Sequence, residues 1–184
     1  DMLELAEKEL REFNGPIDAI VGYTDFPVST MVPILCERFN VPGPSLESVL
    51  KSEHKYWSRL EQKKVIEDFI PAFMPFDPFD DRALEHITLK YPFWIKPIKS
   101  TASQLGFRIN SSKDFKRAIG ILREKIGLFK PFDTLLDIVQ LPEEVARVNS
   151  SFCVAEQIIS GRQCTLEGYV YNGQVRTYGI IDSI

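Results

Sequence analysis

Three charged side chains have positions from which they could carry chemistry, and for two of them a charge is costly unless it has a partner. Lys96 closes the apolar run 93–95, Glu156 interrupts the apolar run 154–159, and Lys55 lies in a helical stretch. Lys96 therefore needs an anion nearby, from the protein or from a ligand, and Glu156 interrupts its run in the same way. Each residue alone also has a structural explanation: a solvated helical lysine, a lysine that ends a strand, or an outward-facing glutamate.

The composition is that of a globular protein. The chain has 184 residues, a net charge of −4, 44% hydrophobic residues and 26% charged residues. The length allows one large domain or two small lobes. No apolar run approaches the ~20 residues of a membrane span, and no secretory signal pattern is present. The acidic balance argues against nucleic acid as a partner. We expect a cytoplasmic protein that has no membrane partner.

The cysteines and histidines do not have metal-ligand spacing. Cys36, Cys153 and Cys164 form no C-x-x-C pair, and His54 and His86 are the only histidines. A structural zinc site is therefore not expected. Reduced, partly buried thiols are the simplest interpretation.

The ends of the chain have a bearing on activity. The sequence starts at Asp1 inside a helical pattern and stops at Ile184 inside an alternating apolar run. We expect a fragment of a longer polypeptide.

The N-terminal part has the pattern of an α/β unit. Residues 2–13 predict an amphipathic helix, and residues 17–23 predict a short buried strand. A helix should follow from Pro27, and residues 41–44 should form a second short strand. Together these elements predict the end of a βαβ sheet.

The rest of the chain changes from helical to β patterns. Ser45 can cap a helix that continues with interruptions to about residue 68, and Ser111 or Ser112 can cap a helix over 113–125. Asn172-Gly173 is typical of a type I′ hairpin turn. The other elements that we expect are one helix over 82–90 and strands over 72–76, 93–97, 105–110, 152–159, 163–171 and 174–184.

The series of motifs from residue 17 to residue 184 resembles the ATP-grasp superfamily. The likeness is to its carboxylate–amine ligase-like members, of the biotin carboxylase and D-alanine–D-alanine ligase type. The matching phrases are Val41-Pro42-Gly43-Pro44-Ser45, His54-Lys55, Phe93-Trp94-Ile95-Lys96-Pro97, Glu156-Gln157-Ile158-Ile159-Ser160-Gly161 and Thr165-Leu166-Glu167-Gly168.

The resemblance implies a nucleotide bound between two lobes. It matches Lys55 and Lys96 to lysines that contact phosphates, a role that suits cations facing a polyanion. It matches Glu156 to a glutamate that accepts from the adenine amino group. Further nucleotide contacts that it implies come from the backbone of Gln157 and Ile159, from the side chain of Gln163 at the ribose, and from Ser100, Thr101 and Ser103 in the phosphate loop.

Two departures from the family pattern concern phosphate and ribose binding. The phosphate loop is usually glycine-rich, whereas residues 100–106 contain one glycine, and the hydroxyls there can donate instead. The ribose position holds Gln163 where many members have glutamate. We expect the magnesium ligands beyond Ile184, and we do not expect Asp182 to be one of them. No catalytic residue is identified.

We therefore expect an α+β chain with an ATP-grasp-like, two-lobed nucleotide cleft, preceded by the tail of an α/β lobe. Residues 1–44 should end a pre-ATP-grasp lobe, residues 45–92 should be a helical lead-in, and residues 93–184 should form a truncated nucleotide-binding lobe.

The function implied by the resemblance is that of an ATP-dependent ligase. ATP would phosphorylate a substrate carboxylate, and an amine or a thiol would displace the phosphate. The cofactors would be ATP and Mg²⁺, the partner a small carboxylate, and a homo-oligomer is compatible with this. The isolated chain would be inactive without its metal ligands. The loop at Tyr23-Thr24-Asp25 could line the substrate side or could be a capped turn.

Two alternatives belong to other classes. A degenerate ATP-grasp module would bind nucleotide or a partner without turnover. A kinase-like phosphotransferase would share a strand lysine, but the chain has no H-R-D, D-F-G or glycine loop. The absence of G-x-x-x-x-G-K-[ST] excludes a P-loop enzyme as far as a motif can.

Overall fold

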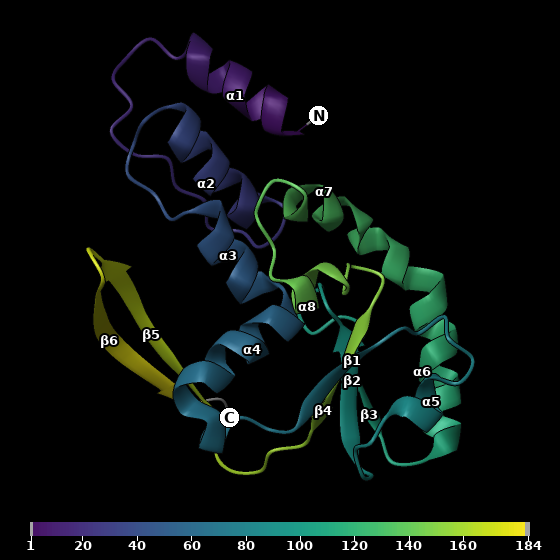
Figure 1. The fold of residues 1–184 in the computed structure, drawn as a ribbon. Helices are drawn as coiled ribbons and strands as arrows, with labels where there is room; N and C mark the ends of the chain where they lie inside the picture. The colour runs from purple at the N-terminus through teal and green to yellow at the C-terminus, as the bar shows by residue number, and fades with distance from the viewer. Residues whose placement is uncertain (1, 183–184) are drawn as a thin grey trace.

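The computed structural model describes residues 2–182, and Figure 1 shows their arrangement. The helices are α1 (Met2–Glu12), α2 (Val28–Arg38), α3 (Leu46–Glu53), α4 (Lys55–Ile66), η1 (Glu67–Phe69), α5 (Ala83–His86), α6 (Ser112–Lys125), η2 (Ile126–Phe132), α7 (Asp133–Leu136) and α8 (Glu143–Ala146). The strands are β1 (Phe73–Phe76), β2 (Phe93–Pro97), β3 (Phe107–Ile109), β4 (Cys153–Gln157), β5 (Cys164–Tyr171) and β6 (Gln174–Asp182).

A four-stranded antiparallel sheet in the order β1-β4-β2-β3 forms the centre of the molecule. Side chains alternate between the faces of a strand. In β2, Phe93 and Ile95 are buried, while Trp94 and Lys96 are partly exposed. The buried side packs against α5 and α6, where Phe115 and Leu122 complete the core (Figure 1). Lys96 therefore lies on the opposite face of the sheet.

The predicted helix caps are confirmed. The Ser45 hydroxyl accepts from the backbone N–H of Ser48 at 3.2 Å, and that of Ser111 accepts from Asp114 at 3.2 Å. Between α3 and α4, His54 serves as a cap that the sequence did not indicate. Its buried Nδ1 accepts from the backbone N–H of Trp57 at 3.1 Å, and its Nε2 lies 2.8 Å from the Val148 carbonyl. The imidazole is neutral in this arrangement, and burial lowers the pKa of His54.

The two strands expected near the N-terminus are absent. Residues 17–23 and 41–44 form no strand, and Val21 and Tyr23 are 88% and 101% exposed. A strand is stable only where a neighbour completes its backbone hydrogen bonds. Every strand within residues 2–182 pairs elsewhere, so the apolar run at 17–23 stays irregular.

The helix expected over 82–90 is also shorter than predicted. Only α5, Ala83–His86, is helical, and residues 87–90 are irregular. Ile87 is buried against the core, 8% exposed. The backbone leaves the helix at Ile87, which is extended with φ −75° and ψ 113°, and a helix this short has little stability of its own to continue further.

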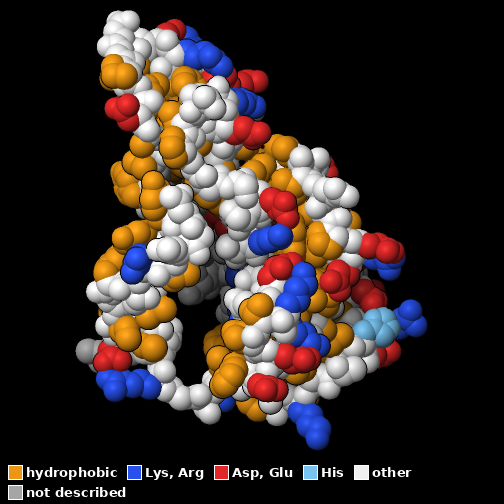
Figure 2. All heavy atoms as spheres, turned by 60° about the vertical axis from the view of Figure 1, so that its left-hand side comes forward, with side chains coloured by type: hydrophobic (Ala, Val, Ile, Leu, Met, Phe, Trp, Pro, Cys, Tyr) orange, Lys and Arg blue, Asp and Glu red, His pale blue; other side chains and the backbone are white. Residues whose placement is uncertain are grey.

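The C-terminal strands form a separate two-stranded ribbon. Asn172 and Gly173 have φ values of 48° and 72°, as the predicted type I′ turn requires. Strands β5 and β6 pair with each other, with a bulge at Glu167/Gly168. Figure 2 shows apolar side chains on this ribbon and an open gap beside it. The last two residues of the strand predicted over 174–184 lie outside the described residues.

Within residues 2–182, no helix has the length and apolar character needed to cross a membrane.

Candidate functional site

Lys55 is the first residue of α4 and lies beside the segment that follows β2. Its Nζ donates to the Ser100 carbonyl at 2.9 Å and lies 3.0 Å from the Ser100 hydroxyl oxygen. These partners are uncharged, and among residues 2–182 no carboxylate forms an ion pair with Lys55. Burial, together with the charges of Lys99 and Lys96, lowers the pKa of Lys55 to about 8. This ammonium therefore lacks an anionic partner.

Glu156 is the anion that Lys96 requires. Its Oε2 lies 2.6 Å from Lys96 Nζ, and its Oε1 accepts from Arg59 Nε at 2.7 Å. The Glu156 side chain is 7% exposed. Burial acts to raise the pKa of Glu156, but the hydrogen bonds from Arg59 and Lys96 outweigh it, so the pKa is lowered. The carboxylate is therefore ionised, with a cation on each oxygen.

The register of β2 and β4 explains this cluster. Trp94 pairs directly with Glu156, and Lys96 pairs with Val154. Directly paired residues share a face, and residues two apart on one strand share a face. Trp94, Lys96 and Glu156 therefore lie together on the face opposite α6. Arg59, one helical turn after Lys55, reaches the same carboxylate from α4.

A cavity of about 390 Å³ lies next to this cluster. It contains four of the residues for which we predict phosphate contacts. It is lined by Lys55, Trp94, Lys96, Ser100, Ser103, Gln104 and Gly106. The structure thus brings both lysines to one hollow, from α4 and from β2.

A tight turn forms one wall of the cavity. The Gln104 N–H donates to the Thr101 carbonyl at 2.9 Å, and Ala102 and Ser103 have φ values of 48° and 57°. Leu105 also has a positive φ, 58°. Side chains in this left-handed conformation cost of order 1–3 kcal/mol each. The backbone therefore adopts glycine-type conformations at three positions without a glycine.

The remaining predicted contacts lie outside this cavity. Thr101 belongs to the same turn but does not line it. The Gln157 N–H donates to the Ala72 carbonyl at 2.8 Å, so it is not free to donate to a base. Ile159 is 69% exposed, and Gln163 is exposed in the link between β4 and β5. Their nucleotide contacts stay predictions.

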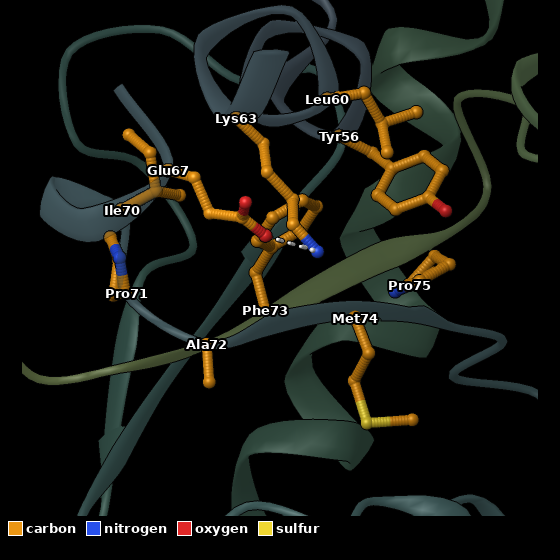
Figure 3. Close-up of a pocket in the computed structure, with 10 residues that line it drawn as sticks. All are labelled: Tyr56, Leu60, Lys63, Glu67, Ile70, Pro71, Ala72, Phe73, Met74 and Pro75. Atoms are coloured by element: carbon orange, nitrogen blue, oxygen red, sulfur yellow. Dashed lines mark ion pairs between the residues drawn. The ribbon is translucent and has the colours of Figure 1, made fainter. Parts of the chain in front are cut away.

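Two other hollows contain none of the lysines for which we predict phosphate contacts. A cavity of about 560 Å³ lies between α4 and β1, where Tyr56 and Phe73 meet and Lys63 lies 3.5 Å from Glu67 (Figure 3). A hollow of about 880 Å³ separates α3 from the tip of the ribbon at Val170 and Tyr171.

Metal ligands are not assigned to this chain. Across the described part of the chain, no group of three or more His, Cys, Asp or Glu side chains is placed to hold a metal ion. Asp182 ends β6 and accepts a hydrogen bond from Arg162. The magnesium ligands expected beyond Ile184 lie outside the described residues.

Three contributors to the site were missed from the sequence. Arg59 lies four residues after Lys55, a spacing that places both on one helix face. Trp94 lies two residues before Lys96, a spacing that places both on one strand face. Both signals were present in the sequence. No pattern in the sequence indicated Lys99, whose charge acts on Lys55.

The fold is that of solved ATP-grasp ligases. The L-amino acid ligase from Bacillus licheniformis matches with a TM-score of 0.70 and 20% identity, over 98% of this chain and 39% of that chain. The D-alanine–D-alanine ligase from Helicobacter pylori matches with a TM-score of 0.59 and 18% identity, over 83% of this chain and 40% of that chain. D-alanyl-alanine synthetase A from Vibrio cholerae matches with a TM-score of 0.55 and 16% identity, over 84% of this chain and 41% of that chain.

These likenesses confirm the expected α+β, ATP-grasp-like fold. The chain spans about two fifths of the length of the ligases that it matches. No family model and no curated protein matches the sequence.

Proposed function

We propose that this chain is the ATP-binding portion of an ATP-dependent carboxylate–amine or carboxylate–thiol ligase that acts through an acyl phosphate. The observation that carries the proposal is Lys55, a largely buried ammonium with uncharged partners at the edge of a cavity that Lys96 also lines. A phosphate group there would supply the missing anion and would favour the charged form of Lys55.

The residues of this chain would bind and orient the nucleotide. Lys55 and Lys96 would neutralise phosphate oxygens, and the Ser100, Thr101 and Ser103 hydroxyls would donate to them. Glu156 would keep Lys96 in place and accept from the adenine amino group. Magnesium would neutralise further phosphate charge when bound, through ligands that we expect after Ile184.

The proposed function includes a division of the chain into three parts. Residues 1–44 would end a preceding lobe, and residues 93–184 would supply most of the nucleotide contacts. Strand β1, within residues 45–92, pairs with β4. The lead-in segment would therefore help to build the nucleotide-binding sheet as well as supply Lys55.

Trp94 provides a direct test of ATP binding. It is 41% exposed and lines the cavity, whereas Trp57, the other tryptophan, is 1% exposed. We expect an ATP analogue to change the tryptophan fluorescence of the full-length protein, because the nucleotide would cover the Trp94 ring. Trp94→Phe should abolish this change while calorimetry still detects binding. If neither fluorescence nor calorimetry detects ATP in the unmutated protein, the proposed function is wrong.

Glu156 predicts a preference for adenine over guanine. A carboxylate offers about four acceptor positions, so it can accept from a base in addition to Arg59 and Lys96. Guanine would present a carbonyl oxygen where adenine has its amino group, and an unpaired buried acceptor costs about 1–3 kcal/mol. We expect ATP to bind at least roughly tenfold more tightly than GTP.

Competition between ATP and GTP measures this preference in the parent and in Glu156→Gln. The amide of the variant can donate to guanine, so the preference should decrease. Equal affinity for ATP and GTP in the unmutated protein would remove Glu156 from the base site.

An activity assay distinguishes the proposed ligase from a degenerate module that binds nucleotide without turnover. Release of ADP and phosphate by the full-length protein, dependent on an added carboxylate and an amine, supports the ligase. ATP binding without such turnover across a panel of carboxylates supports the degenerate module.

A further inference from the structure

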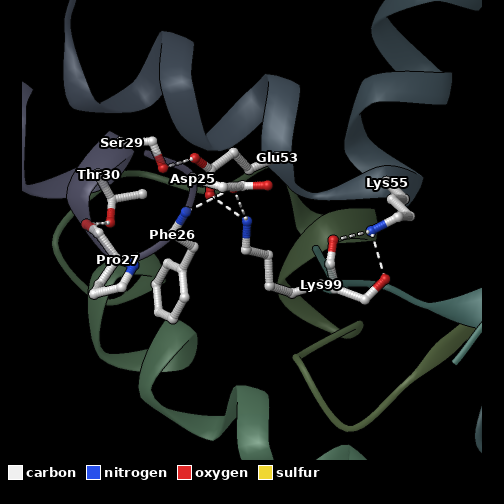
Figure 4. Close-up of polar contacts among 9 residues, drawn as sticks. Asp25, Phe26, Pro27, Ser29, Thr30, Glu53, Lys55 and Lys99 are labelled. Carbon is white, nitrogen blue, oxygen red and sulfur yellow. Dashed lines mark hydrogen bonds and ion pairs between the residues drawn. The ribbon is translucent and has the colours of Figure 1, made fainter. Parts of the chain in front are cut away.

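Lys99 is a buried cation that the proposed nucleotide contacts do not use. Its side chain is 2% exposed, and its Nζ lies 2.6 Å from Glu53 Oε2 and 3.4 Å from Asp25 Oδ1. The rings of Phe26 and Phe132 lie beside the ammonium, at 5.0 and 5.6 Å from Nζ to the ring centroids. Figure 4 shows Lys99 pointing toward Glu53 and Asp25, with Lys55 on the neighbouring segment.

The partners of Lys99 come from separate parts of the chain. Glu53 ends α3, and its second oxygen accepts a hydrogen bond from Ser29 of α2. Asp25 precedes α2, and its Oδ1 also accepts from the Phe26 backbone N–H at 2.6 Å. The ammonium therefore joins the segment before α2 and the end of α3 to the residues after β2.

Three consecutive attachments join residues 98–100 to residues 53–55. The Lys55 backbone N–H donates to the Ile98 carbonyl at 3.1 Å. Lys99 pairs with Glu53, and Lys55 Nζ bonds to the carbonyl and hydroxyl of Ser100. Lys99 is the central attachment of the three, between the end of β2 and the turn at 101–104. It therefore reinforces the two direct contacts that hold Lys55 beside that turn.

We infer that Lys99 is a positioning residue of the nucleotide site, fixing Lys55 and the start of the phosphate turn against each other. The inference rests on the proposed function for the identity of the ligand. The arrangement around Lys99 is a property of this chain whatever the ligand is.

The charge of Lys99 also acts on Lys55. The largest charge effects on the pKa of Lys55 come from Lys99 and Lys96, which lower it, and from Asp25 and Glu156, which raise it; Glu53, the partner of Lys99, is not among them. After burial, the Lys99 charge is the largest cause that lowers the pKa of Lys55 to about 8. Removal of the Lys99 charge should therefore raise the pKa of Lys55. A residue that only filled space would leave this titration unchanged.

The double variant Lys99→Met/Glu53→Gln tests this inference. It removes both members of the ion pair, so that no buried carboxylate loses its main partner, and Met keeps an unbranched stem between the two rings. Lys99→Arg keeps the positive charge. Lys8→Met is a matched control, because Lys8 lies on α1, 67% exposed and 3.8 Å from Glu12.

Two measurements are made on the full-length protein. Calorimetry with an ATP analogue at pH 7.5 should show a loss of affinity of about tenfold in the double variant and parent-like affinity in Lys8→Met. A titration of the lysine side chains by NMR, without nucleotide, should show a higher midpoint for Lys55 in the double variant. In Lys99→Arg that midpoint should stay near that of the parent.

The outcomes separate this inference from the proposed function. If the unmutated protein does not bind ATP, the proposed function fails, while the Lys55 titration still tests the positioning. A folded double variant with parent-like ATP affinity and an unchanged Lys55 midpoint would overturn the role of Lys99. If the double variant does not fold, Lys99→Arg decides the matter. Its charge is retained, so an upward shift of the Lys55 midpoint in this variant would show that the inference is wrong.

Discussion

Replacement of Lys96 by alanine is expected to weaken ATP binding by about ten- to a hundredfold. Loss of one charge-assisted hydrogen bond costs on the order of 1.5–3 kcal/mol, and each 1.4 kcal/mol is a factor of about ten in affinity. Lys96 lines the cavity and is 30% exposed, so its ammonium can contact a ligand while it stays paired with Glu156. Calorimetric titration of the full-length protein with an ATP analogue measures the change.

The matched control is Lys90→Ala, which removes an exposed lysine just before β2. Lys96 also neutralises Glu156, so its removal could affect the stability of the fold. Arg59 still holds that carboxylate in the variant, so the fold should persist. Circular dichroism and the thermal midpoint check this. A folded Lys96→Ala protein with unchanged ATP affinity would exclude a phosphate contact for Lys96.

Replacement of Glu156 by alanine is expected to destabilise the protein by about 3 kcal/mol. Removal of one member of a buried ion pair leaves the partner without compensation, at a cost of about 3–5 kcal/mol. The lower end applies because Arg59 and Lys96 are 24% and 30% exposed and can be partly hydrated. Urea denaturation at pH 7 measures the change in the free energy of unfolding.

A surface ion pair provides the control for Glu156. Glu143 pairs with Arg147 in α8 and just beyond it, and both side chains are more than 70% exposed. Glu143→Ala should cost less than about 1 kcal/mol, as exposed pairs do. Equal destabilisation by Glu143→Ala and Glu156→Ala would show that burial of the Glu156 cluster has no special energetic role.

The stabilisation by Glu156 should depend on pH. The pKa of Glu156 is lowered from its ordinary value of 4.5, so the folded state binds fewer protons at this group than the unfolded state. Stability from this group is therefore complete above the unfolded pKa and is lost as the pH falls through the folded pKa. The difference in stability between the parent and Glu156→Ala should thus shrink in acid. A difference that stays constant down to pH 3 would contradict this assignment.

Local structure was largely determined by the sequence. Ser45, and either Ser111 or Ser112, indicated helix starts because a serine hydroxyl can satisfy a free backbone N–H group nearby, and the structure uses Ser45 and Ser111. Asn172-Gly173 indicated the hairpin because both residues accept positive φ. The apolar run that Lys96 closes indicated a buried strand over 93–97; the strand is present, but only one of its faces is buried and Trp94 is 41% exposed. Each of these features is decided within a few residues along the chain.

The same local reasoning was wrong where stability depends on distant partners. Residues 17–23 are as apolar as a buried strand, but no strand of the described chain pairs with them. Residues 82–90 have a helical pattern, but Ile87 packs into the core and the helix ends at His86. Pairing and packing partners come from far along the chain, so periodicity alone does not reveal them.

The candidate site divides in the same way. The sequence indicated Lys96 and Glu156 because charges in apolar runs need partners, and the resemblance to the ATP-grasp superfamily added Lys55. The tertiary structure decided who those partners are. The β2–β4 register brings Glu156 to Lys96, α4 brings Arg59 to the same carboxylate, and Lys99 is held by Glu53. Lys55 is left with uncharged partners, since which charges meet in a folded chain depends on how its elements pack and not on their order.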